Sequence, residues 1–113
     1  FTVIMVDLLG MGASGRPPGF DKTWELEKVI SYFTDSLNVL ISEKLKLKKI
    51  HLLGHSFGGY IAGEYALKYP TQLEHLILLS PVGMPELPDN YNLDVLKEHY
   101  SDSYFTKKGI ETV

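Results

Sequence analysis

The sequence predicts an α/β domain built on a mostly parallel sheet. Three short apolar runs, at residues 2–8, 49–54 and 75–81, alternate with two segments that have helical character. A strand–helix–strand–helix–strand order is typical of sheets whose parallel strands are joined by helical crossovers. The runs are continuously apolar rather than alternating, as expected of strands that are buried on both faces.

The first run, TVIMVDL at residues 2–8, contains four β-branched residues and predicts a buried strand. Glycine, serine and proline then dominate residues 10–19, which indicates a loop.

A long amphipathic helix is predicted from Trp24 to about Leu45, because apolar residues recur there at steps of three and four. Acidic residues in its first turn suit the positive end of the helix dipole. Asp21 or Thr23 is the expected N-cap, since short polar side chains accept hydrogen bonds from the first free N–H groups.

The second half of the chain repeats the pattern. KIHLLG at residues 49–54 predicts a strand, residues 57–70 predict a helix that ends at a proline, and HLILLSP at residues 75–81 predicts a third strand. Residues 82–113 begin with a proline-rich loop and carry only a weak helical pattern.

The composition of the chain excludes several classes of function and binding site. The net charge of −3 gives no electrostatic footprint for nucleic acid, so no nucleic-acid partner is expected. The chain has no cysteine, which excludes disulfides and thiolate metal sites and favours an intracellular protein. No apolar run approaches the ~18 residues of a membrane span, so membrane contact is expected to be peripheral if it occurs. Neither a metal nor a cofactor is expected.

The glycine-rich loop matches two nucleotide-binding patterns only superficially. Gly10, Gly12 and Gly15 have the spacing of a dinucleotide fingerprint, which requires a helix to begin at the last glycine. Pro17 and Pro18 instead delay any helix, and Pro17 also stands where a P-loop needs serine or threonine. We therefore expect these glycines to form a tight turn beneath a site built elsewhere.

That site is predicted at the Gly-x-Ser-x-Gly motif of residues 54–58, which joins an expected strand directly to an expected helix. A serine hydroxyl is a weak nucleophile unless it is exposed to a base and aimed at a carbonyl. A sharp strand-to-helix turn achieves this by holding Ser56 in a strained conformation, and side chains at positions 54 and 58 would collide there. The Phe57 N–H, at the start of the helix, would point toward the oxyanion formed on attack.

These residues resemble the α/β-hydrolase superfamily. Gly54, His55, Ser56, Phe57, Gly58 and Gly59 are similar to its nucleophile elbow, and VDLLGMGASGRP resembles its fourth strand and the following loop. ALKYPTQLEHLILLSPVGMPELP is similar to the next helix, strand and start of the cap, with most likeness to the branch of lysophospholipid hydrolases and lipase coactivators. The resemblance implies strands four to six with flanking helices, with residues 1–81 in a partial core and residues 82–113 at the start of the cap.

The resemblance also implies roles for individual residues. Ser56 would be the nucleophile and the Phe57 N–H one oxyanion donor, whereas His55 would be supportive rather than catalytic. His51 and His75 are expected to be structural. The acid and histidine of the triad would lie on later strands, beyond this chain.

The fold implied by the resemblance has a gap in this sequence. Its third strand lies between the fourth and the fifth, so residues 2–8 and 49–54 would both border a strand that this chain does not supply. Unpaired buried strand edges are costly. We therefore expect the chain to need the remainder of a domain of roughly 250 residues, or a completing chain.

Three functions are compatible with these features. The first is a serine hydrolase or acyltransferase acting on an ester or acyl-lipid bond, with the 113-residue piece inactive alone. The second is a non-catalytic subunit or lipid-handling scaffold. A lyase reaction on the same elbow is a third alternative, because a fold alone does not determine chemistry.

Overall fold

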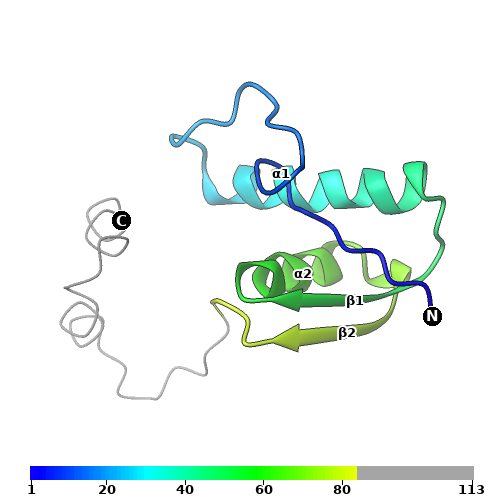
Figure 1. Cartoon of the computed structure of the whole chain (residues 1–113). Coiled ribbons are helices and arrows are strands. Elements are labelled where there is room, and N and C mark those ends of the chain that lie inside the picture. The colour runs from blue at the N-terminus through cyan, green and yellow to red at the C-terminus, as the bar shows by residue number, and fades with distance from the viewer. Residues whose placement is uncertain (84–113) are drawn as a thin grey trace, which may run out of the picture.

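The computed structural model describes residues 1–83 (Figure 1). Two helices and two strands are the main elements. They are α1 (Leu26–Asn38), β1 (Ile50–His55), α2 (Phe57–Lys68) and β2 (Leu73–Leu79), with a π-helical turn at Val39–Lys44 and a 3₁₀ turn at Pro70–Gln72. All but the first two residues of the predicted cap, residues 82–113, lie outside the described part of the chain.

The two strands pair in parallel, as predicted, with α2 as the crossover between them. Ile50 lies opposite Leu73, and after an irregularity His51 lies opposite His75 and the ladder continues to residues 55 and 79. The third of the predicted strands, at residues 75–81, corresponds to β2, which begins and ends two residues earlier. Since parallel strands finish at a common edge, the ends of β1 and β2 are neighbours.

The prediction of a strand at residues 2–8 is wrong for this structure. This segment forms no ladder hydrogen bonds, and its residues 1–7 are exposed. Its apolar side chains line one side of a cavity of about 1270 Å³ whose other side includes residues 50–55 of β1. A strand exists only with a hydrogen-bonding neighbour, and none of the described residues fills this space.

Helix α1 is shorter than the predicted span of residues 24–45, because the last turn of that span is π-helical. The predicted caps are also wrong. Glu25 occupies the N-cap position and its side chain makes no capping bond. Asp21 instead accepts a hydrogen bond from the Thr23 N–H at 2.8 Å, in a turn that precedes the helix.

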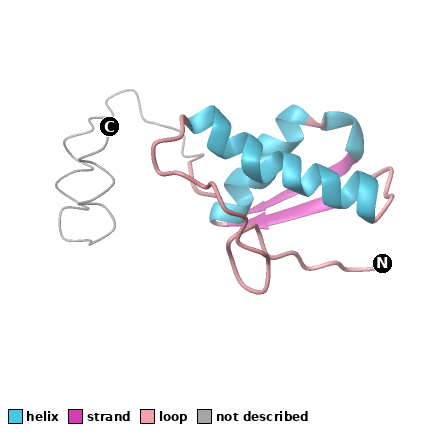
Figure 2. Cartoon of the chain, turned by 90° about the horizontal axis from the view of Figure 1, so that it is seen from above, coloured by secondary structure: helices cyan, strands magenta, loops and turns pink. Residues whose placement is uncertain are grey.

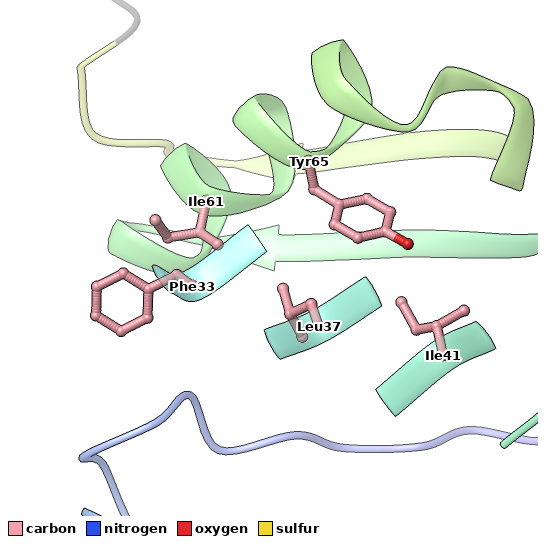
Figure 3. Close-up of a cluster of buried hydrophobic side chains, with 5 residues drawn as sticks. All are labelled: Phe33, Leu37, Ile41, Ile61 and Tyr65. Atoms are coloured by element: carbon pink, nitrogen blue, oxygen red, sulfur yellow. The ribbon is translucent and has the colours of Figure 1, made fainter. Parts of the chain in front are cut away.

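Both helices lie on the same side of the sheet, with α2 next to the strands and α1 packed on α2 (Figures 1 and 2). The apolar stripe of α1 and its π-helical turn meets α2 there, and Figure 3 shows the side chains pointing toward one another. The buried cluster consists of Phe33, Leu37, Ile41, Ile61 and Tyr65. Its burial supplies the main hydrophobic stabilisation of the described region.

A polar network crosses this helix interface. The fully buried Tyr65 donates its hydroxyl to Gln72 Oε1 at 2.5 Å. The amide nitrogen of Gln72 donates to Asn38 Oδ1 at 2.7 Å and to the Ser42 hydroxyl at 3.0 Å. The network joins α1, its π-helical turn, α2 and the 3₁₀ turn, so it sets their relative positions.

The opposite face of the sheet is covered by no described helix or strand, although the Phe1 ring lies edge-on to His51 there at 5.8 Å. Leu53 of β1 is 57% exposed, and Ile77 and Leu79 of β2 are 43% and 47% exposed. His51 and His75 lie on this face with their Nδ1 atoms 2.9 Å apart. A mostly apolar sheet face of this kind is ordinarily buried by a further layer.

Candidate active site

Ser56 forms the sharp turn between β1 and α2. Its backbone has φ 52° and ψ −120°, in a region that residues with a Cβ rarely adopt. The strand ends at His55 and the helix begins at Phe57, so this single residue makes the whole change of direction. Such a conformation costs of order 1–3 kcal/mol and persists only where its surroundings enforce it.

Close packing of glycine backbones makes the turn possible. A Cβ at Gly54 would clash with the carbonyl oxygen of Gly58 and lie 2.7 Å from the Gly59 Cα. A Cβ at Gly59 would lie 2.9 Å from the Pro81 Cβ. At Gly58, in contrast, no described atom lies within 4 Å of an added Cβ, so the crowding expected there is found at Gly59.

Backbone hydrogen bonds hold Ser56 from the side of β2. Its N–H donates to the Leu79 carbonyl at 3.1 Å, which extends the parallel ladder by one residue. Its carbonyl oxygen accepts from the Val82 N–H at 3.1 Å and from the Gly59 N–H at 3.0 Å. These bonds explain how the strained conformation of Ser56 is maintained.

Phe57 opens α2, and its N–H is one of the first-turn donors that no intrahelical bond can satisfy. Its ring is 36% exposed and lies edge-on to the buried ring of Phe33, with 5.6 Å between centroids. Phe20 continues the row at 6.4 Å from Phe33. The Tyr60 ring lies 6.4 Å from that of Phe57, and burial, with a smaller effect from nearby Glu64, raises the pKa of its phenol.

The histidines do not form a base for Ser56 within the described residues. His55 is exposed and makes no side-chain hydrogen bond with any residue of 1–83. The ring of His51 stacks on that of His75, with centroids 4.9 Å apart, on the sheet face away from the helices. The pairing of these two rings could not be predicted from sequence, because it depends on the strand register.

The glycine-rich loop of residues 10–19 folds around the carboxylate of Asp7, the residue at the end of the preceding apolar run. Asp7 Oδ2 accepts the Ala13 N–H at 2.9 Å, and the Gly10 N–H donates to the Gly15 carbonyl at 3.0 Å. An added Cβ at Gly12 would collide with the Asp7 carboxylate. Because an anionic side chain fills the centre of the turn, the loop has no room for a phosphate.

One residue of this edge escaped the sequence analysis. Ser80 directly follows β2, as Ser56 follows β1, and it also has a positive φ, of 42°. The signal was present in the sequence, since GHS and LLS both end an apolar run with serine. Its left-handed conformation was not foreseeable, because proline follows it and the residue before proline is normally extended.

Two kinds of feature are absent from residues 1–83. No group of three or more potential metal-ligating side chains occurs in this part of the chain. No helix there has both the length and the apolar character needed to cross a membrane.

Comparison with known proteins places the chain in a family. Its residues 1–108 match the family model described as the alpha/beta hydrolase fold. It is 46% identical over 87 residues to a protein of Rattus norvegicus named 1-acylglycerol-3-phosphate O-acyltransferase ABHD5. That alignment covers 77% of this chain and 24% of the relative. It is 49% identical over 69 residues to a Saccharomyces cerevisiae protein named 1-acylglycerol-3-phosphate O-acyltransferase ICT1. That alignment covers 61% of this chain and 17% of the relative.

The chain thus spans about a quarter or less of the length of these relatives. Among solved structures, a probable hydrolytic enzyme from Pseudomonas aeruginosa PAO1 superposes with a TM-score of 0.59 at 23% identity. That alignment covers 87% of this chain and 34% of the other and supports the fold alone. The family match, together with the parallel βαβ unit and the strained serine between β1 and α2, shows that this chain belongs to the alpha/beta hydrolase fold family.

Proposed function

We propose that the protein is an enzyme that transfers acyl groups from ester or acyl-lipid bonds, to water as a hydrolase or to another alcohol as an acyltransferase. The observation that carries this proposal is the conformation of Ser56, a residue with a Cβ kept at φ 52° between a strand and a helix N-terminus. Strain of this kind is retained at functional sites. The family membership of the chain supports the same interpretation.

In the proposed reaction, the Ser56 hydroxyl oxygen attacks the carbonyl carbon of the ester. Its proton passes to a base outside the described residues, and the Phe57 N–H donates to the oxyanion. The bond from the carbonyl carbon to the alcohol oxygen then breaks, and the alcohol leaves with that proton. Water or a second alcohol takes the acyl group from Ser56 and restores the free hydroxyl.

An acyl-lipid substrate fits the surroundings of Ser56 better than a small polar ester. The residues Phe57 and Phe20 are 36% and 52% exposed, and their rings pack against the buried ring of Phe33 and present apolar surface beside the turn. The rat and yeast relatives are named acyltransferases of acylglycerol phosphate. Both points favour a substrate with an acyl chain.

The proposed enzyme requires more than residues 1–113. The bare sheet face and the cavity beside β1 indicate surfaces that a larger domain would bury. We expect the remaining triad acid, histidine and second oxyanion donor to come from that region. Residues 82–113 would start the cap that selects the substrate.

A fluorophosphonate probe tests the proposal directly. The protein at its full natural length should react covalently at one serine, identified as Ser56 by mass spectrometry, and Ser56→Ala should abolish the labelling. Ser31→Ala is a control, because it removes a serine hydroxyl on α1 that bonds Lys68 Nζ at 3.2 Å and leaves the elbow intact. A folded protein that stays unlabelled would instead support the non-catalytic scaffold. The chain of 113 residues alone should show no esterase activity.

A further inference from the structure

Three residues other than glycine have a positive φ in the described region: Lys46 at 53°, Ser56 at 52° and Ser80 at 42°. Four glycines, Gly10, Gly12, Gly19 and Gly83, also have positive φ there, so the chain uses glycine for such turns where no side chain is needed. A side chain kept at such a position has either a local structural reason or a function.

Lys46 has a local structural reason. It lies two residues after the π-helical turn Val39–Lys44, and Leu47 beyond it donates its N–H to the Ile41 carbonyl at 2.9 Å. A left-handed residue just past a helix end is the ordinary way to close a helix C-terminus. The strain at Lys46 thus belongs to the chain reversal before β1.

Ser80 also has a structural role, because its turn brings the Val82 N–H to the Ser56 carbonyl at 3.1 Å, but glycine could make that turn without strain. It ends a strand rather than a helix, and Pro81 after it disfavours any conformation other than an extended one. Ser80 is exposed, so its hydroxyl is open to a ligand. Glycine would remove the strain at no cost in packing, so the hydroxyl itself is the feature that the position retains.

The sheet places Ser80 beside the proposed nucleophile. His55 pairs with Leu79, so Ser56 and Ser80 are the next residues of two neighbouring parallel strands. Strands in a sheet are about 5 Å apart, so one substrate can contact both side chains. The Ser56–Leu79 and Ser56–Val82 hydrogen bonds hold the backbone on both sides of Ser80 against this edge.

We propose that the Ser80 hydroxyl contacts the substrate and hydrogen-bonds the alcohol portion, such as a glycerol hydroxyl, that leaves or accepts the acyl group. The inference rests on the proposed function, because Ser80 is assigned relative to a nucleophilic Ser56. The apolar rings of Phe57 and Phe20 suit the acyl portion, which leaves a polar contact for the alcohol portion. Ser80 is therefore a residue that determines specificity for the alcohol.

Two esters with the same acyl chain test this assignment in the protein at its full natural length. One is a 1-monoacylglycerol, whose alcohol carries free hydroxyls, and the other is a p-nitrophenyl ester, whose alcohol carries none. Ser80→Ala and Ser80→Gly should each lower kcat/KM for the monoacylglycerol about five- to tenfold, the value of one hydrogen bond. The value for the p-nitrophenyl ester should change by less than about twofold, because it never formed that bond.

The two variants also distinguish the effect of losing the hydroxyl from the effect of relieving backbone strain at residue 80. Ser80→Gly relieves the strain and should raise Tm, while Ser80→Ala keeps the strain. Lys46→Gly is the matched control, since it relieves equal strain far from the site and should raise Tm without changing the preference between the two esters.

The result that overturns the inference is a Ser80→Gly protein with the preference of the wild type, or one that loses activity on both esters equally. Either result would mean that Ser80 only shapes the turn. Fluorophosphonate labelling distinguishes this from failure of the proposed function. If Ser56 of the wild type is labelled, only the role of Ser80 fails, and if a folded wild type is not labelled, both proposals fail.

Discussion

Tyr65 and Gln72 form a buried hydrogen bond of 2.5 Å, in which the phenol donates to the side-chain carbonyl oxygen. Tyr65 is 0% exposed, so this bond is made where water cannot replace it. Burial also raises the pKa of the Tyr65 phenol above its ordinary 10.0. The pair fixes the C-terminal half of α2 against the turn that leads into β2.

Removing this hydroxyl should destabilise the fold. We expect Tyr65→Phe to lower the free energy of unfolding by about 1–3 kcal/mol, because Gln72 Oε1 loses its partner in a buried site. Tyr69→Phe, which removes a hydroxyl at the exposed Asp35, should cost less than Tyr65→Phe. Urea unfolding of the three proteins measures this, and equal losses would contradict the role given to burial.

The apolar interface between α1 and α2 predicts a larger effect. Leu37 is 9% exposed and Leu67 is 80% exposed, although both are leucines on helices. Leu37→Ala should lower the free energy of unfolding by about 2–5 kcal/mol through a cavity that its neighbours fill only partly. Leu67→Ala should change it by less than about 0.5 kcal/mol. Thermal unfolding compares the two, and a comparable loss at Leu67 would show that an undescribed part of the protein covers it.

The two adjacent glycines of the elbow should respond differently to alanine. An added Cβ at Gly59 lies 2.9 Å from Pro81 Cβ, whereas one at Gly58 meets no described atom within 4 Å. Gly59→Ala should therefore lower the free energy of unfolding by about 1–3 kcal/mol. Gly58→Ala should leave it unchanged or raise it by up to about 1 kcal/mol, since alanine favours a helix more than glycine does. The order of the two Tm values checks this, and the reverse order would contradict the packing of Pro81 on α2.

A surface cluster at the end of α2 predicts a pH dependence. Asp35 accepts hydrogen bonds from Lys68 Nζ at 2.5 Å and from the Tyr69 hydroxyl at 2.7 Å. These bonds, Lys68 first, lower the pKa of Asp35, and the bond to Asp35 raises the pKa of Tyr69 from its ordinary 10.0 to about 12.

The two shifts act at opposite ends of the pH scale. The lowered pKa of Asp35 contributes stability above its ordinary 3.8, and this contribution is lost as the pH falls through the folded value. The raised pKa of Tyr69 contributes stability below 10.0 that is lost as the pH rises through about 12. Asp35→Asn should move the tyrosinate titration of Tyr69 back toward 10.0, measured as the absorbance difference from Tyr69→Phe. An unchanged titration would show that burial, rather than Asp35, sets the value.

The sequence by itself determined the βαβ order and the position of the serine turn. The apolar runs at residues 49–54 and 75–81 and the helical residues between them occur within two residues of the predicted places. Local patterns suffice for these elements, because β1 and β2 pair with each other and α2 covers them within the same short stretch. The motif at residues 54–58 predicted the bend at Ser56 for the same reason: glycines at close approach are a local requirement.

Tertiary structure decided the rest. Residues 2–8 have the composition of a strand but form none, since a strand depends on a neighbour that local sequence does not supply. The strand register brought His51 to His75, and the parallel edge brought Ser80 to Ser56. Contacts between residues far apart in sequence depend on register and chain reversal, which no single run of residues encodes.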